Sequence, residues 1–238
     1  MATRLFSVVF DASDHIALGR WWASALELSV AGERDNEAWI EPRDAPELIF
    51  VPVPEPKTSK NRIHLDLAST SPEHQQAIVD RLISLGAKHA EIGQRDIPWV
   101  VLSDPEGNEF CVLEPRETYV DATPVAAIVI DTHDVEAQTA FWQEASGWAV
   151  ERINPWGSRL RRPDGVGPYL EPTKRPDAMT VKNRVHIDVA PALGDDHAAE
   201  VERLITLGAR RIDIGQGDVP WTVLADPEDN EFCVLTPR

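Results

Sequence analysis

Residues 80–116 read DRLISLGAKHAEIGQRDIPWVVLSDPEGNEFCVLEPR, and residues 202–238 read ERLITLGARRIDIGQGDVPWTVLADPEDNEFCVLTPR. The two stretches align without a gap at an offset of 122 residues. Roughly two-thirds of their positions are identical, which is far above chance for segments of this length. Self-similarity at one fixed offset indicates that the chain holds two copies of one structural unit.

The repeat continues toward the start of each copy. The segment KNRIHLD at 60–66 recurs as KNRVHID at 182–188. Further upstream the offset falls to 120, because Trp22 matches Trp142. We therefore expect a two-residue insertion between about residues 172 and 180, in a proline-rich loop that tolerates added length. A short polar stretch joins the copies and predicts domains at 1–118 and 123–238.

Composition narrows the class of protein. Hydrophobic residues make up 42% and charged residues 26% of the 238 positions, as in soluble globular proteins. A net charge of −17 argues against a nucleic-acid partner, which would be repelled. The chain has no long apolar run and no signal-peptide pattern at its start, so we expect a cytoplasmic protein without a membrane partner. Cys111 and Cys233 occupy matching positions, and no disulfide is expected between them.

Hydrophobic patterning assigns the elements of the first copy. The apolar, β-branched run at 5–11 predicts a strand. Ser13 or Asp14 can cap the helix that follows, in which Trp22 belongs to the buried side. Short strands are expected at 37–41 and 48–53. The first half of the copy therefore has the order βαβββ when its edge strands are counted.

The second half of the copy repeats that order. The stretch 62–68 alternates between apolar and polar side chains, as a half-buried strand does. Ser71 and Pro72 open a helix, and strands at 99–103 and 109–113 are joined by a tight turn. A sheet built this way packs one face on its helices and leaves the other free to curl around a cavity. The side chains expected on that free face are Arg62, His64, Asp66, Trp99, Glu109 and Cys111.

The phrase PWVVLSDPEGNEF at 98–110 and the phrase KNRIHLDL at 60–67 resemble the vicinal oxygen chelate superfamily, and within it the glyoxalase-like and bleomycin-resistance-like proteins. The resemblance implies an α+β protein of two tandem glyoxalase-like domains, each with two βαβββ modules in a curled mixed sheet around a cavity. From the duplication we also expect the two domains to pack as a pseudo-twofold pair, either as a monomer with an internal pseudo-dimer or as a homodimer. The superfamily includes lyases, epimerases, dioxygenases, thiol transferases and ligand-sequestering proteins, so the fold alone leaves the activity open.

Metal-dependent members of that superfamily hold a divalent ion with His and Glu side chains on the concave face. Transferred position by position, this set is incomplete here. The first-strand ligand falls on Ser7 and Ala127, and the last-strand ligand falls on Cys111 and Cys233. The resemblance matches Val51 with Glu171, so it leaves Glu171 and His186, with Cys233 as a third donor, as the candidate metal site. The expected cofactor is either none or one divalent metal such as zinc.

The candidate ligand-binding residues carry alternative interpretations. Trp99 and Trp221 can wall a pocket for a flat apolar ligand, or they can lie in the core or between domains. The histidines can bind a ligand or simply bond to neighbouring side chains, and the cysteines can be small buried hydrophobes. Arg62 with Asp66 and Arg184 with Asp188 can form salt bridges or clamp a substrate carboxylate. The predicted set is Arg62, His64, Asp66, Trp99, Cys111, Arg184, His186, Asp188, Trp221 and Cys233.

Three functions are compatible with these observations. The first is a small-molecule-binding protein with an incomplete metal site that sequesters an aromatic or apolar ligand. The second is a metal-dependent lyase, isomerase or dioxygenase that uses Glu171 and His186. The third is a scaffold for protein interactions. The incomplete ligand set favours the first.

Overall fold

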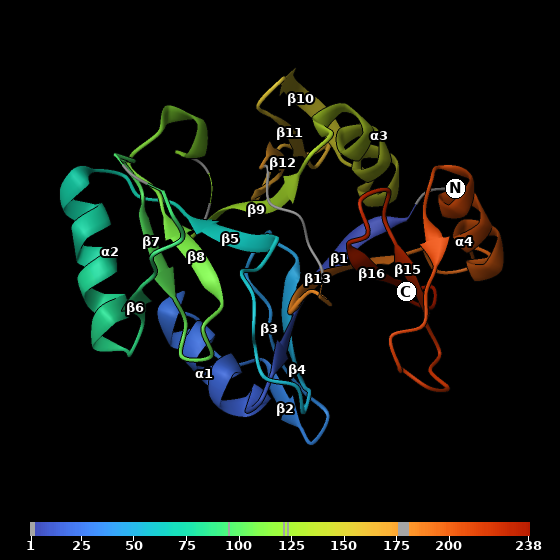
Figure 1. Cartoon of the computed structure of the whole chain (residues 1–238), viewed down its shortest axis with the longest axis horizontal. Helices are drawn as coiled ribbons and strands as arrows, with labels where there is room; N and C mark the ends of the chain where they lie inside the picture. Colours follow the sequence, from blue (N-terminus) through green and yellow to red (C-terminus); the bar gives the residue numbers. More distant parts are fainter. Residues whose placement is uncertain (1–2, 95, 121, 123, 176–180) are drawn as a thin grey trace.

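The computed structural model describes residues 3–94, 96–120, 122, 124–175 and 181–238. Within these ranges the chain forms four copies of a βαβββ module (Figure 1). The first two modules are β1 (Arg4–Ala12), α1 (His15–Ala25), β2 (Gly32–Arg34), β3 (Glu37–Ile40) and β4 (Glu47–Pro52), then β5 (Ile63–Leu67), α2 (Pro72–Ser84), β6 (Lys88–His89), β7 (Val100–Ser103) and β8 (Glu109–Val112). The last two are β9 (Val125–Thr132), α3 (Val135–Ser146), β10 (Ala149–Asn154), β11 (Gly157–Arg161) and β12 (Tyr169–Lys174), then β13 (Val185–Ala190), α4 (His197–Thr206), β14 (Arg210–Arg211), β15 (Thr222–Ala225) and β16 (Glu231–Val234).

The modules pair across the two sequence copies. One eight-stranded sheet, here called sheet A, has the order β14-β15-β16-β13-β1-β4-β3-β2. The other, sheet B, has the order β10-β11-β12-β9-β5-β8-β7-β6. Sheet A thus joins the first module to the fourth, and sheet B joins the second to the third. The expectation that each copy builds its own sheet is corrected, while the predicted mixed sheets and α+β class are confirmed.

In each sheet, two antiparallel central strands join the module from the first copy to the module from the second. β1 pairs with β13, with Val8 opposite Ile187, and β5 pairs with β9, with Ile63 opposite Ile130. These positions are all fully buried or nearly so. The alternation of apolar residues specifies which face of a strand is buried, but the four central strands are nearly interchangeable in this respect. The sequence pattern therefore does not say which of them become neighbours.

The strand register places the two-residue insertion earlier in the sequence than predicted. Val9 pairs with Ile49 in sheet A, and Val129 pairs with Glu171 in sheet B. The structural counterpart of Glu171 is therefore Ile49, not Val51, and the two extra residues lie before β12, in the loop 162–168. In that loop Gly167 has a φ of +85°, and a Cβ there would lie 1.9 Å from the Asp44 carbonyl oxygen. A glycine is needed because this loop packs on the corresponding loop of the first copy.

The helices cover the convex faces of the sheets, and the core lies beneath them (Figure 1). Asp14 caps α1 by accepting a hydrogen bond from the Ala17 amide, as predicted from the sequence. Trp22 is fully buried, and its indole N–H donates to Asp104 at 3.1 Å. Trp142 is its buried counterpart in the second copy, so the prediction that both tryptophans belong to the core is confirmed. Among the helices in the described ranges, none is long and apolar enough to cross a membrane.

Candidate functional site

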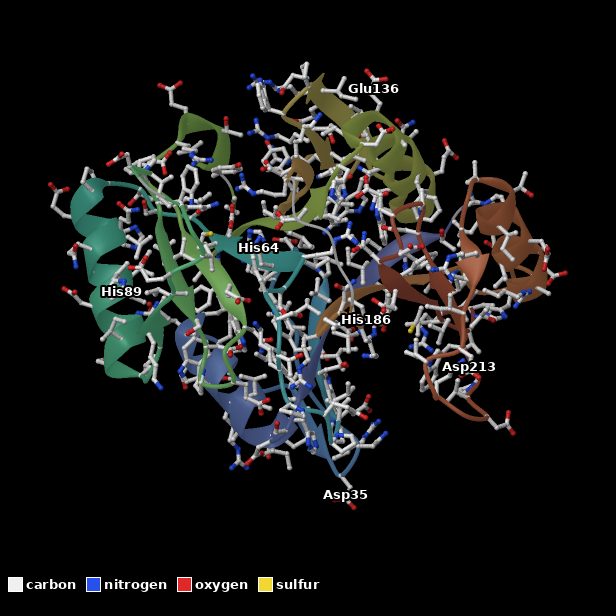
Figure 2. The ribbon with its side chains drawn as sticks, viewed as in Figure 1. Asp35, His64, His89, Glu136, His186 and Asp213 are labelled. Atoms are coloured by element: carbon white, nitrogen blue, oxygen red, sulfur yellow. The ribbon has the colours of Figure 1, made fainter. Side chains whose placement is uncertain are left out.

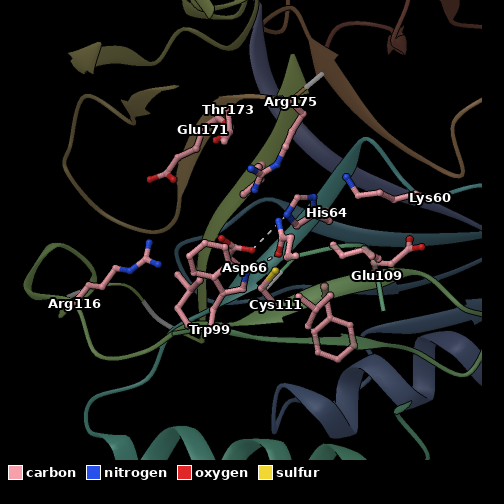
Figure 3. Close-up of a pocket in the computed structure, with 16 residues that line it drawn as sticks. Lys60, His64, Asp66, Trp99, Glu109, Cys111, Arg116, Glu171, Thr173 and Arg175 are labelled. Atoms are coloured by element: carbon pink, nitrogen blue, oxygen red, sulfur yellow. Dashed lines mark hydrogen bonds and ion pairs between the residues drawn. The ribbon is translucent and has the colours of Figure 1, made fainter. Parts of the chain in front are cut away.

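A cavity of about 180 Å³ lies on the concave face of sheet B (Figure 3). Side chains from both sequence copies form it, because β5, β7 and β8 come from the first copy and β9 and β12 from the second. Its lining is mixed in character: an indole, a thiol and several aliphatic groups alternate with charged side chains. The lining includes Lys60, His64, Asp66, Gln94, Trp99, Glu109, Cys111, Arg116, Glu171, Thr173 and Arg175.

Three potential metal-ligating side chains form the floor of this cavity. His64 and Asp66 lie two residues apart on β5, so both point to the concave face. Cys111 lies opposite Asp66 on the parallel neighbour β8. His64 Nε2 is 3.6 Å from Asp66 Oδ1, and one donor atom from each of the three residues lies within 4.8 Å of the others. Within the described part of the chain, Asp66 Oδ1 is buried and accepts no hydrogen bond.

Burial controls the protonation of this floor. It lowers the pKa of His64 to about 4, so the imidazole is neutral at physiological pH. Burial, with the nearby Glu171 carboxylate second, raises the pKa of Asp66 to about 7. Burial also raises the pKa of the Cys111 thiol, and the adjacent Asp66 adds to this effect. A neutral imidazole, a thiol and a carboxylate oxygen without a partner are a donor set that a divalent ion such as zinc can use.

Trp99 forms a wall beside the floor. The side chain is half-buried at the entrance to β7 and lines the cavity. Its indole N–H donates to Gln94 Oε1 at 3.0 Å, which fixes the ring plane. The Arg116 guanidinium lies 5.7 Å from the ring centre. Trp99 therefore offers a flat apolar surface inside a cavity that is otherwise largely polar.

The second copy supplies the opposite side. Glu171 on β12 accepts hydrogen bonds at 2.9 Å from Arg159 Nε and at 2.9 Å from the Tyr119 hydroxyl. Tyr119 lies in the linker between the copies, in the short 3-10 helix Glu117–Tyr119, and its side chain is buried. Burial, with Glu171 second, raises the pKa of Tyr119, so the hydroxyl remains a donor. Glu171 is thus already neutralised by protein partners.

Sheet A carries a second donor set with different surroundings. His186, Asp188 and Cys233 repeat the first set, and His186 Nε2 is 3.6 Å from Asp188 Oδ1. Here Ser7 donates to Asp188 Oδ2 at 3.1 Å, whereas Ala127 stands opposite Asp66 in sheet B. At the positions of Glu171 and Thr173, sheet A has the aliphatic residues Ile49 and Val51. The two concave faces share a floor but differ in the strand beside it.

Several predicted site residues lie elsewhere. Arg62 and Arg184 do not pair with Asp66 and Asp188; instead Arg62 binds Glu228, and Arg184 binds Glu106. Both arginines are buried outside the cavity. Their side chains leave the central strands at the end where the copies meet, which strand alternation alone does not reveal.

The predicted metal pair of Glu171 and His186 is also wrong. Glu171 lies on β12 in sheet B, whereas His186 lies on β13 in sheet A. Figure 2 labels His64 and His186, one on the central strand of each sheet. The histidine that shares a cavity with Glu171 is His64. The pairing failed because it assumed one sheet for each sequence copy.

The predicted set also includes Trp221, which lies outside the cavity, and omits Arg116, which lines it, and Tyr119, which bonds to Glu171. Trp221, the counterpart of Trp99, is 38% exposed and lies in sheet A's half of the molecule, outside this cavity. Tyr119 and Arg116 follow the last strand of the first copy and would pass for linker residues. At the same offset of 122 residues, Arg238 matches Arg116.

The comparisons with known proteins agree with this architecture. The sequence profile of the glyoxalase-like domain matches residues 7–113 and again 127–235. The chain therefore belongs to the glyoxalase-like domain family, in a form with two tandem copies. A search of curated proteins finds no match.

Two solved structures show the same fold at low identity. Glyoxalase I from Zea mays superposes with a TM-score of 0.66 at 14% identity, over 99% of this chain and 92% of that one. A putative dioxygenase from Bacillus subtilis superposes with a TM-score of 0.65 at 11% identity, over 99% of this chain and 85% of that one. A glyoxalase/bleomycin resistance protein from Albidiferax ferrireducens matches 45% of this chain and 95% of its own at 22% identity, with a TM-score of 0.36.

Proposed function

We propose that this protein binds a small molecule in the cavity of sheet B. The observation that carries the proposal is the combination of an enclosed floor of His64, Asp66 and Cys111 with the flat wall of Trp99. Binding sites are concave and usually place a few polar groups against an apolar surface, as here. The charged lining argues for a ligand with polar groups on a flat body rather than for a purely apolar one.

The partner of Asp66 is central to this proposal. A buried carboxylate oxygen without a hydrogen bond is costly to the folded protein, so a ligand that donates to it gains affinity. Glu171 has two protein donors and is a weaker candidate for direct binding. We therefore place the ligand between Trp99 and Asp66, with a hydroxyl or N–H directed at Asp66 Oδ1.

Ligand-detected NMR with a set of one- and two-ring aromatic compounds tests this proposal. The compounds are phenol, indole, 2-naphthol, benzamide and benzoate, each measured against the wild type, Trp99→Ala and Trp221→Ala. We expect saturation transfer to at least one compound, lost in Trp99→Ala and retained in the matched Trp221→Ala variant. Absence of transfer to every compound, or equal losses in both variants, would contradict the proposal.

A second candidate function uses the same floor as a metal site, and the donor set His64, Asp66 and Cys111 favours it. The fold family implies a divalent metal, and these residues fit one because three different donor types converge around an oxygen without a partner. When bound, such an ion would act as a Lewis acid toward a substrate oxygen. Trp99 would orient the substrate, and the Arg159–Glu171–Tyr119 group would keep water out of that side of the cavity.

Cobalt binding separates the two candidates. Protein treated with EDTA and titrated with Co²⁺ should develop a thiolate-to-cobalt absorption band if Cys111 is a ligand, and Cys111→Ser should remove the part of the band that belongs to sheet B. Cys233→Ser is the matched variant, because it changes only the donor set of sheet A. No absorption and no retained zinc in the purified protein would exclude the metal-dependent function and leave the binder.

A further inference from the structure

Two of the three acidic side chains that line the cavity of sheet B, Glu109 and Glu171, have cationic partners within the protein. Glu109 bonds to Lys57, 2.9 Å away, and accepts the Asn61 amide N–H. Glu171 bonds to Arg159 at 2.9 Å. These pairs are largely buried, so they hold their geometry and do not turn toward a ligand.

Arg175 is less completely paired. Its Nε lies 3.7 Å from Asp131 Oδ1, while the other oxygen of Asp131 accepts a hydrogen bond from Lys60 at 2.5 Å. Among the described residues, the Arg175 guanidinium makes no hydrogen bond. Figure 3 shows it directed into the cavity above His64. Its side chain is 32% exposed, so a ligand can reach it.

Arg116 offers a second set of donors at another side of the cavity. Its Nε donates to Glu114 at 2.6 Å, which fixes the guanidinium. Within the described ranges, the terminal nitrogens form no ion pair with a carboxylate. The group lies 5.7 Å from the Trp99 ring and 5.8 Å from the Tyr119 ring. Both arginines therefore present planar N–H donors to the cavity, and Arg116 does so over the indole ring.

Sheet A has a counterpart of Arg116, Arg238, but none of Arg175. The Arg175 amide donates to the Thr132 carbonyl, and at the equivalent place the Val53 amide donates to the Ala12 carbonyl. Valine thus replaces Arg175, just as Ile49 replaces Glu171. The chain carries a net charge of −17, so two guanidinium groups in one small cavity form a local exception to an acidic molecule. The floor of His, Asp and Cys side chains cannot account for these guanidinium groups, because sheet A has the same floor.

We propose that the cavity of sheet B selects a flat organic anion, an aromatic carboxylate, whose carboxylate binds Arg175 and whose ring lies on Trp99. The planar guanidinium fork matches a carboxylate with two parallel N–H donors, which a lysine would not do. Arg116, which lies over the Trp99 ring, adds attraction for the anion. This inference rests on the proposed small-molecule site and adds the chemical class of its ligand.

Calorimetric titration of matched acid and amide probes tests the ligand class. The probes are benzoate and 2-naphthoate, with benzamide and 2-naphthamide as neutral partners of the same shape. We expect the acids to bind at least tenfold more tightly than the amides at low salt, and this advantage to shrink in 500 mM NaCl. Arg175→Gln should weaken acid binding by about 10- to 100-fold and leave amide binding within about twofold.

The control variant is Arg238→Gln, because Arg238 is the counterpart of Arg116 in the other sheet. It should leave acid binding unchanged, whereas Arg116→Gln should weaken it. If the amides bind as well as the acids and Trp99→Ala abolishes both, the anion class is wrong and the small-molecule site stands. If no probe binds at millimolar concentration, both proposals fail. If Arg175→Gln and Arg238→Gln weaken acid binding equally, the assignment to sheet B is wrong.

Discussion

Arg62 of the first sequence copy donates to Glu228 Oε2 of the second copy at 3.0 Å and to the Glu228 carbonyl oxygen at 2.8 Å. Glu228 also accepts the backbone N–H groups of His133 and Asp134 at the start of α3. The mirror contact joins Arg184 to Glu106 at 3.3 Å. One acidic side chain in each DPE turn therefore bonds the two backbone amides that precede a helix and holds the two copies together.

Removing Arg62 should destabilise the protein strongly. The Arg62 side chain is 8% exposed and that of Glu228 is 12% exposed, so Arg62→Ala leaves a buried carboxylate without its cation. We expect a loss of about 3–5 kcal/mol in the free energy of unfolding, measured by urea denaturation. The exposed pair of Arg20 and Glu33 provides the comparison, and Arg20→Ala should change the midpoint very little. Equal effects of the two substitutions would show that the Arg62 contact does not stabilise the joint.

The carboxyl group of Asp66 should make stability depend on pH. Its pKa is raised from 3.8 to about 7 in the folded protein, so the folded state holds a proton that the unfolded state releases. The associated stability is complete below about pH 4 and is lost as the pH rises through 7. The side chain of Asp66→Asn cannot ionise. The free energy of unfolding of this variant, minus that of the wild type, should therefore rise by at most about 4 kcal/mol between pH 4 and pH 8.

Urea denaturation of both proteins across this range measures the difference. Asp35→Asn, in the exposed turn between β2 and β3, controls for the removal of one negative charge. The pKa of His64 is lowered to about 4, so its contribution is present above pH 6.5 and is lost as the pH falls toward 4. That contribution is common to the wild type and Asp66→Asn, and it largely cancels in their difference. A difference that stays flat with pH would contradict the buried environment of Asp66.

The two cysteines should be unreactive in the folded protein. Cys111 and Cys233 are each 7% exposed, and burial raises the pKa of both thiols, with Asp66 and Asp188 as the next cause. Only a thiolate attacks a disulfide reagent at an appreciable rate. We expect Ellman's reagent to react slowly with the native protein. After denaturation in guanidinium chloride, it should react readily with both thiols. Ser84→Cys, on the exposed end of α2, supplies a fast-reacting control. Rapid reaction of the native wild type would mean that the cavity floor is open to solvent.

Much of this architecture follows from local sequence patterns. The alternation in the segment 62–68 places His64 and Asp66 on one face because a strand has a period of two residues. The duplication predicts a matching strand around His186, and the structure contains it. These features depend only on neighbours in the sequence, so a single chain reveals them.

The arrangement of the sheets depends on contacts that local patterns do not encode. β5 and β13 have nearly the same pattern, so either could pair with β1 by that criterion, and the structure pairs β13 with it. That choice decides whether Glu171 meets His64 or His186. The counterpart of Glu171 was also misplaced, since a two-residue insertion can be located from sequence only where both flanks are similar. Residues from other elements, such as Tyr119 and Arg159, complete the cavity only after the sheets are assembled.

A single sequence copy should not fold as a monomer. Residues 1–120 contain β1 and β5, which pair with β13 and β9 of the other copy, so each would expose a central strand edge. Because the copies are so similar, β1 of one chain can pair with β5 of another and rebuild both sheets by symmetry. We expect this fragment to elute as a dimer in size-exclusion chromatography with light scattering, and to dissociate only as it unfolds. A folded monomer with a native-like circular dichroism spectrum would show that one copy can close its own sheet, and would overturn the exchange of modules as the basis of the cavity.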